Sequence, residues 1–221
     1  MARARRTRGP SGDPELTLPP EDFEPLDPEY HDLAKASLLL RLYAPAVYRA
    51  TPTRFREVGP IERFDHQRPA ADGRPRRDPG RGILYAAPSL LCCVGEYFGD
   101  QGEIALPGVR LARLTVVAPL RLLDLRGTAA TGAGTIPAIS AITRRATTQA
   151  WARWWYEHPQ LAGVDGLLYD AANSGATAVA VTERARGKVV RRRGHHWPLS
   201  EPRLADELEV AAHRLRLAVA P

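Results

Sequence analysis

Four side chains stand out because their chemical types could act together on a nucleotide. Tyr48 and Arg49 are adjacent, Tyr85 follows a short apolar run, and Glu96 comes eleven residues after Tyr85. A guanidinium binds phosphate oxygens through a planar fork, and a tyrosine ring stacks on a flat base. A carboxylate stabilises positive charge that develops on a sugar. Together these residue types indicate chemistry on a nucleotide such as NAD+.

Glu96 has the side chain best suited to catalysis. Cleavage of the bond between ribose and nicotinamide passes through an oxocarbenium-like state. A carboxylate near the anomeric carbon stabilises that state, as in glycoside hydrolysis. Glu96 is the only charged residue between Leu91 and Phe98. The alternative interpretation is an ordinary exposed position on a helix, where charged residues are common.

Arg49 and the two tyrosines also have structural explanations. In the functional interpretation Arg49 binds a pyrophosphate, while Tyr48 and Tyr85 order a nicotinamide or adenine ring. In the structural interpretation Arg49 lies on the solvent face of a strand, since burying an unpaired guanidinium is costly. The tyrosines then pack in the core. Each residue alone favours the structural interpretation, whereas the four together favour a site.

Three further segments are weaker candidates. Asn173-Ser174-Gly175 has the composition of a turn, although the Ser174 hydroxyl is also suited to binding a ligand amide or phosphate. His195-His196 has no Cys, Asp or Glu at metal-ligand spacing, so we expect a surface turn and no metal site. Segment 68–81 is rich in Pro, Gly and Arg. It predicts either a solvated connection or a loop over a phosphate-rich ligand.

The composition is typical of one globular domain with short extensions. Of the 221 residues 44% are hydrophobic, which is enough for a core. The net charge of +6 comes almost entirely from arginine, because Lys35 and Lys188 are the only lysines, and it weakly favours anionic partners. Adjacent Cys92 and Cys93 are poorly placed to bridge each other. This cysteine usage and the short apolar runs predict a soluble, cytoplasmic protein without membrane spans.

We expect four regions along the chain. Residues 1–26 are charged and rich in Pro, which predicts a flexible tail. Asp27-Pro28 has the sequence of a helix start, so a helix is predicted over 27–45, with its last turn near Tyr43. A catalytic domain is predicted over 46–198. A C-terminal amphipathic helix over 199–221 is predicted to pack on that domain, with apolar positions from Leu204 to Ala218.

The candidate residues fall on elements of both kinds within the domain. Tyr48 and Arg49 belong to a predicted strand over 46–50, Tyr85 to one over 82–86, and Glu96 to a helix over 88–99. Further strands are predicted over 109–117, 120–125, 166–169 and 176–182, a helix over 136–157, and a basic hairpin arm over 184–193. This mixture without regular βαβ alternation predicts an α+β fold.

The motifs, taken together, resemble those of the RES domain family, which is named for its Arg, Glu and Ser residues. Four motifs match in register over about residues 46–183: Val47-Tyr48-Arg49-Ala50, Arg63-Phe64-Asp65, Gly82-Ile83-Leu84-Tyr85 through Glu96, and Asp165-Gly166-Leu167-Leu168-Tyr169. The resemblance implies a single α+β domain with an ADP-ribosyltransferase-like fold. In that fold twisted β-sheets flanked by helices form a cleft for NAD+.

The resemblance also implies roles for individual residues. Arg49 matches the motif arginine and Glu96 the motif glutamate, which makes both catalytic. Tyr48 and Tyr85 match aromatic residues of the NAD-binding pocket. Arg63 matches a second basic residue that contributes to NAD binding.

Two positions depart from the family pattern. Glu62 precedes Arg63 where many members have Gly, and the position of the family serine is occupied by Ala171. Ser174, three residues further on, is the candidate to replace the missing hydroxyl in NAD binding. Loss of one ligand contact of this kind costs about 1 kcal/mol and does not by itself abolish chemistry.

Known members of the family include toxins of bacterial toxin–antitoxin pairs that consume NAD+ by phosphorolysis or hydrolysis. The resemblance therefore implies NAD+ as substrate, inorganic phosphate as a co-substrate option, no bound cofactor, and a helix-turn-helix antitoxin as partner. Two other functions stay open, namely ADP-ribosyl transfer to a macromolecule and non-catalytic binding of NAD+ or nucleic acid. A homo-oligomer is also left open.

Overall fold

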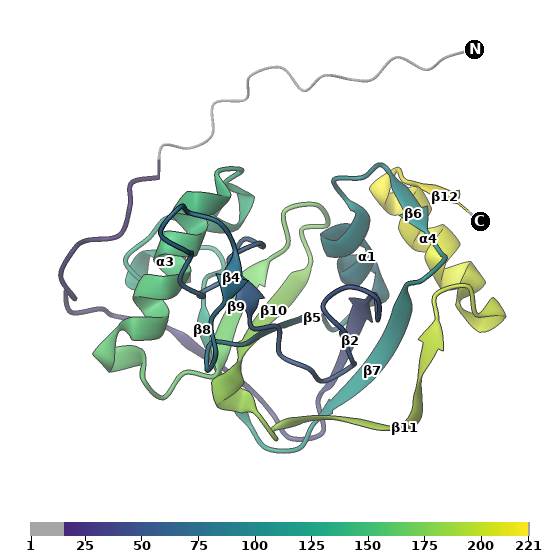
Figure 1. Cartoon of the computed structure of the whole chain (residues 1–221), viewed down its shortest axis with the longest axis horizontal. Helices are drawn as coiled ribbons and strands as arrows, with labels where there is room; N and C mark the ends of the chain where they lie inside the picture. The colour runs from purple at the N-terminus through teal and green to yellow at the C-terminus, as the bar shows by residue number, and fades with distance from the viewer. Residues whose placement is uncertain (1–15, 221) are drawn as a thin grey trace, which may run out of the picture.

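Five strands form the largest sheet of the protein (Figure 1). The computed structural model describes residues 16–220. The strand order is β1-β8-β9-β10-β5, in which β8 and β9 are parallel and the other neighbours are antiparallel. The strands are β1 (Tyr30–Leu33), β8 (Leu120–Asp124), β9 (Gly166–Asp170), β10 (Thr177–Thr182) and β5 (Ile83–Ala86). The central pair β9 and β10 is buried on both faces, as their apolar sequences require.

A second sheet of three antiparallel strands packs against the first. It has the order β11-β7-β2, formed by β11 (Val189–Pro198), β7 (Arg110–Val116) and β2 (Leu38–Tyr43). One buried cluster contains Leu39 and Leu114 from this sheet together with Leu122, Leu168 and Val181 from the first. A core therefore lies between the sheets, and an isolated bridge from β2 to Ala87 joins their edges.

Two short strand pairs complete the sheets. The C-terminal β12 (Ala218–Ala220) runs parallel to β6 (Glu103–Ala105), and β3 (Val58–Gly59) is antiparallel to β4 (Arg76–Arg77). Because β4 lies inside segment 68–81, part of that arginine-rich segment is paired strand and not open loop. Buried Asp78 accepts three hydrogen bonds from Arg68 and thereby ties down the same segment.

The helices lie on two sides of the sheets. In Figure 1, α3 (Arg145–Glu157) lies at one end of the view, whereas α1 (Leu90–Phe98) and α4 (Ala205–Leu215) pack together at the other. The remaining helices are α2 (Ala129–Gly132) and the 3-10 turns η1 (Pro137–Ala141), η2 (Pro159–Leu161), η3 (Glu183–Ala185) and η4 (Pro202–Leu204). Ser89 caps α1, because its Oγ accepts a hydrogen bond from the backbone N–H of Cys92. This cap fixes where the helix that carries Glu96 begins.

The helix predicted over 27–45 is wrong, because this region forms β1 and β2. The leucine run of β2 was compatible with a helix on propensity alone. Its alternate residues instead enter two different buried clusters, Leu39 on one face and Leu42 on the other. Ala36, with φ of +73°, provides the sharp turn that separates the two strands.

The strand predicted over 46–50 is also wrong. Residues 44–50 form two successive turns, in which the N–H of Val47 bonds to the carbonyl of Ala44 and that of Ala50 to Val47. Tyr48 and Arg49 both have φ of +51°, a left-handed conformation that no strand contains. Pro45 cannot donate to a sheet, which favours a turn here.

Residues 16–26 of the predicted flexible tail pack along α3, and residues 1–15 lie outside the described part of the chain. The indole N–H of Trp151 donates to the carbonyl of Thr17, and Phe23 contacts the rings of Trp154 and His158. We call residues 16–26 the N-terminal strap. It passes around α3 before the chain enters β1 (Figure 1).

The other predicted elements have close counterparts. Strands β5, β7, β8, β9 and β10 and helix α1 begin and end within two residues of their predicted bounds, whereas α4 is six residues shorter at each end than the predicted helix 199–221. The predicted helix 136–157 is divided into η1 and α3, and the basic segment 184–193 becomes η3 and the start of β11. Beyond α4 the last residues form β12 and not helix.

Candidate active site

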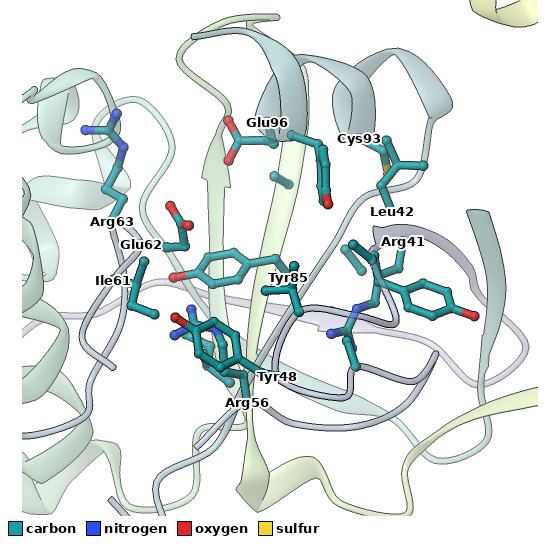
Figure 2. Close-up of a pocket in the computed structure, with 18 of the residues that line it drawn as sticks. Arg41, Leu42, Tyr48, Arg56, Ile61, Glu62, Arg63, Tyr85, Cys93 and Glu96 are labelled. Carbon is teal, nitrogen blue, oxygen red and sulfur yellow. The ribbon is translucent and has the colours of Figure 1, made fainter. Parts of the chain in front are cut away.

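An open cleft of about 460 Å³ lies where the two sheets and α1 meet. This volume is within the range of sites for small molecules and cofactors. Most of its walls come from β2 (Arg41), β5 (Tyr85), β9 (Tyr169), α1 (Glu96) and segment 44–63, with single residues from β4, β10 and α3. Figure 2 shows Tyr85 near the middle, with Glu96 above it and Arg56 below it in this view.

Glu96 faces the cleft and is held by a buried tyrosine. The phenolic hydroxyl of Tyr169 donates a hydrogen bond of 2.8 Å to Oε2 of Glu96. The residue is accessible from the cleft opening, while the surrounding walls desolvate its carboxyl. Burial raises the pKa of Glu96, and the Tyr169 hydrogen bond and the positive charge of Arg63 act in the opposite direction. The site therefore holds a carboxylate under partial desolvation, which strengthens its effect on nearby positive charge.

Tyr85 has its hydroxyl fixed beneath the cleft. It donates a hydrogen bond of 2.9 Å to Oδ1 of Asp65 and accepts one of 3.1 Å from the backbone N–H of Phe64. Burial raises the pKa of Tyr85 well above its ordinary value, and the charge of Asp65 adds to this shift. Tyr85 is therefore a neutral aromatic surface, and its hydroxyl is already engaged by protein groups.

Arg41 is a buried guanidinium in the cleft wall. It is 8% exposed, and its Nη1 donates to the carbonyls of Pro52 and Arg54. It has no carboxylate within ion-pair distance among residues 16–220. Burial, followed by repulsion from Arg56, lowers the pKa of Arg41 to about 10. A buried cation without a counter-ion is a site prepared for an anion.

Tyr48 and Arg49 have different positions relative to the cleft. Tyr48 is 49% exposed and lines the opening. Arg49 is exposed and is not among the residues that line the cleft, and its backbone carbonyl accepts a hydrogen bond from Arg54. The structure thus brings Tyr48 to the site and leaves the Arg49 side chain outside it.

Arg63 lies on the same side of the cleft as Glu96. Its Nη1 is buried and has no hydrogen-bond partner within residues 16–220, and its charge lowers the pKa of both Glu96 and Tyr169 against the opposing effect of burial. Glu62 beside it forms an ion pair with Arg145. Arg63 is therefore a second guanidinium available to a ligand.

Ser174 does not line the cleft. Its Oγ accepts a hydrogen bond from the backbone N–H of Ala176 within its own turn, and its Cβ lies 3.2 Å from the position that a side chain on Gly95 would occupy. Neighbouring Asn173 does line the cleft and donates to the carbonyl of Gly95. Ala171, at the position of the family serine, is buried.

The β2 side of the cleft is basic, whereas the α1 side has carboxylates together with the cations Arg63 and Arg145. Arg41, Arg54 and Arg56 come from β2 and the loop after it, and Arg56 is paired with Asp65 at 2.8 Å. Glu96 and Asp100 come from α1 and the turn after it. A ligand with an anionic part and a cationic part fits such a charge distribution.

The profile of the RES domain family matches residues 39–200. The chain belongs to the RES domain family. No curated protein matches the chain. Among solved structures, a chain of the crystal structure of the M. tuberculosis MbcT–MbcA toxin–antitoxin complex is similar, with 20% sequence identity and a TM-score of 0.51. The match covers 81% of this chain and 92% of that chain, and it confirms the predicted single-domain α+β fold.

The RES domain begins within β2, two residues before Arg41. Sequence reasoning missed Arg41, although it is the only charged residue in β2 and its burial would have required an explanation. Asp65 and Tyr169 occur in the family motifs, but the sequence predicts no role for either side chain in the site. Their contacts with Tyr85 and Glu96 span 20 and 73 residues, respectively, and leave no local signal in the sequence.

The RES domain offers no metal-binding cluster of three or more His, Cys, Asp or Glu side chains within residues 16–220. Cys92 and Cys93 are buried free thiols, and burial raises the pKa of both. None of the helices in residues 16–220 has the length and apolar character needed to cross a membrane.

Proposed function

We propose that this protein cleaves the ribosyl–nicotinamide bond of NAD+ and acts as the toxin of a toxin–antitoxin pair. The observation that carries the proposal is the shared cleft of Arg41 and Glu96. One is a buried guanidinium without a carboxylate partner within residues 16–220, and the other is a carboxylate that is exposed at the opening and partly desolvated by the cleft walls. NAD+ has the matching halves, an anionic pyrophosphate and a positively charged nicotinamide ribosyl group.

The pyrophosphate is assigned to the basic side of the cleft. Arg41 presents a guanidinium that already bonds to two carbonyls through Nη1, so its other N–H groups are free to meet phosphate oxygens. Arg54, at the same opening, adds a second cation. Because Arg49 lies outside the cleft lining, we assign to Arg41 the phosphate-binding role that the sequence motif had suggested for Arg49.

The nicotinamide riboside is assigned to the side that contains Glu96. The rings of Tyr85 and Tyr48 provide flat surfaces next to the carboxylate, suited to the nicotinamide and its ribose. As the C1′–N bond breaks, nicotinamide leaves with the bonding electron pair and positive charge develops on the sugar. Glu96, oriented by Tyr169, stabilises that charge.

An oxygen nucleophile completes the reaction at the anomeric carbon. Attack by inorganic phosphate gives an ADP-ribose phosphate ester, and attack by water gives ADP-ribose with release of a proton. Arg63, with its unpartnered Nη1 near Glu96, supplies positive charge that favours an anionic acceptor. The family assignment and the likeness to a structure of a toxin–antitoxin complex support the expectation of an antitoxin partner.

The decisive experiment is incubation with NAD+ in the presence and absence of phosphate, with all products resolved by mass. Release of nicotinamide with an ADP-ribose phosphate ester demonstrates phosphorolysis, and release with free ADP-ribose demonstrates hydrolysis. Label that appears on protein or nucleic acid demonstrates ADP-ribosyl transfer. NAD+ that stays intact in all conditions contradicts the proposed cleavage.

A further inference from the structure

Asp65 is a fully buried carboxylate that serves as acceptor for four donors. Its exposed fraction is 0%. Oδ1 accepts hydrogen bonds from the hydroxyl of Tyr85 at 2.9 Å and from Nη2 of Arg56 at 2.8 Å. Oδ2 accepts from the backbone N–H groups of Ile61 at 2.6 Å and Glu62 at 2.9 Å. Four bonds fill the capacity of a carboxylate.

All four donors belong to residues that line the cleft, whereas Asp65 itself does not line it. Tyr85 forms the middle of the cleft and Arg56 its basic side, and the Ile61–Glu62 backbone leads into Arg63. One carboxylate behind the cleft wall therefore connects three separate parts of that wall.

We propose that Asp65 is a positioning residue that holds Tyr85, Arg56 and the start of the Arg63 loop in the geometry that the substrate requires. Its catalytic consequence rests on the proposed NAD+ cleavage. The hydroxyl of Tyr85 donates its hydrogen bond to Asp65, so the contact behind the cleft wall fixes the orientation of the ring and leaves only the ring to contact a ligand. The charge of Asp65 also compensates Arg56, which lies close enough to Arg41 to repel it.

The Asp65→Asn variant tests the positioning role of Asp65 without changing the volume of its side chain. It keeps the side-chain size but removes the negative charge. It also replaces one of the two acceptor oxygens by an NH2 group, which cannot accept the two hydrogen bonds that this oxygen received. The matched control is Asp165→Asn, which changes another buried aspartate that is paired with a cation, Lys188, and with the backbone N–H of Arg121. Asp165 does not line the cleft.

The first measurement needs no substrate. Ultraviolet difference titration of the parent protein against Tyr85→Phe isolates the ionisation of Tyr85, and the same difference is taken in the Asp65→Asn background. Because the Asp65 charge adds to the effect of burial in raising the pKa of Tyr85, Tyr85 is expected to ionise at lower pH once that charge is removed. Equal ionisation in both backgrounds overturns the proposal. So does a Tyr85 that titrates in the parent together with the exposed tyrosines.

The second measurement is NAD+ turnover. Asp65→Asn is expected to lower kcat/KM by at least about tenfold, and the double variant with Tyr85→Phe to be no worse than Asp65→Asn, since both act through one contact. Asp165→Asn is expected to keep the parent kcat/KM. An Asp65→Asn protein with parent kcat/KM, or with a loss matched by Asp165→Asn, shows a merely structural role and overturns the proposal.

Two outcomes require a different measurement, namely a parent protein without NAD+ cleavage and an Asp65→Asn protein that does not fold. If the parent protein leaves NAD+ intact, the proposed function fails, and the Tyr85 titration alone decides the positioning role of Asp65. If Asp65→Asn does not fold, Tyr85→Phe carries the kinetic test. It breaks the Tyr85–Asp65 bond and the bond that the Tyr85 hydroxyl accepts from the N–H of Phe64, and it leaves the other three bonds of Asp65 in place. A fall in kcat/KM of threefold or more at unchanged melting temperature supports the proposal, and an unchanged value overturns it.

Discussion

The hydroxyl of Tyr169 lies 2.8 Å from Oε2 of Glu96 and donates a hydrogen bond to it. This bond connects β9 of the large sheet with α1, although Tyr169 and Glu96 are 73 residues apart in the sequence. This contact does more than support the carboxylate. Burial raises the pKa of Glu96, and Tyr169 is the first of the groups that oppose this rise. The Tyr169 hydrogen bond therefore favours the ionised form of Glu96, which the proposed stabilisation of a sugar cation requires.

Replacing Glu96 with Gln should abolish most NAD+ cleavage. The amide keeps the shape of the side chain but carries no charge to stabilise the oxocarbenium-like state, so kcat is expected to fall about 10²- to 10³-fold. Product formation is followed by mass. Glu209→Gln, on the exposed face of α4, is the matched control and should keep parent activity. An active, folded Glu96→Gln protein removes Glu96 from the mechanism.

Replacing Tyr169 with Phe should move the pH dependence of turnover. The hydrogen bond from Tyr169 favours the ionised form of Glu96, so its loss leaves burial less opposed and raises the pKa of Glu96 further. Cleavage requires the carboxylate and is lost as pH falls through that pKa. The acidic limb of the kcat/KM profile is therefore expected at higher pH in Tyr169→Phe than in the parent. An acidic limb that stays in place, or moves to lower pH, contradicts the assignment.

Substitutions of Arg41 and Arg49 should have unequal effects on NAD+ affinity. Arg41→Lys loses the planar fork inside the cleft, and the dissociation constant is expected to rise about 10- to 100-fold, since bonds to charged groups are worth about 1.5–3 kcal/mol. Arg49→Lys should leave it unchanged, because that side chain lies outside the cleft lining. Calorimetry in the Glu96→Gln background measures binding without turnover. The reverse order of effects would restore Arg49 as the phosphate ligand.

Removing the N-terminal strap should destabilise the region around α3. A chain that begins at Asp27 lacks the Thr17–Trp151 hydrogen bond and the contacts of Phe23 with Trp154 and His158. Compared with a chain that begins at Leu16, we expect a loss of about 2–3 kcal/mol in unfolding free energy. Urea denaturation measures the loss, and tryptophan emission should shift to longer wavelength. Equal midpoints and spectra would mean that the strap contributes nothing.

The sequence predicted elements best where a start or stop signal was local. Ser89 and Gly99 bracket α1, and the alternating Val and Ala of β10 are typical of a buried strand. The leucine run of β2 was wrongly predicted as helix, because a continuous apolar segment is compatible with both helix and strand. Only its pairing with β7 distinguishes the two. The turn at Tyr48–Arg49 was wrongly predicted as a strand. Two consecutive left-handed residues that are not glycine cannot be recognised from the amino-acid composition of the segment.

For the candidate site, the sequence predicted residue types better than residue positions. Tyr48, Arg63, Tyr85 and Glu96 do line one cleft, whereas Arg49 and Ser174 do not. The expectation for Arg49 rested on a strand over 46–50, whereas these residues form turns and the arginine that lines the cleft from a strand is Arg41 of β2. Asp65 and Tyr169 act through long-range contacts, so their importance becomes visible only once the chain is folded.

The cleft is bounded by two separate sheets, with Arg41 on the smaller and Tyr85 and Tyr169 on the larger. Apart from their common core, the edges of these sheets are joined between β2 and β5 by the reciprocal backbone bonds of Leu40 and Ala87. A dinucleotide that contacts both sheets would stabilise the junction between β2 and β5. Binding of the dinucleotide should therefore slow amide hydrogen exchange at Leu40 and Ala87, whose N–H groups donate to each other's carbonyls.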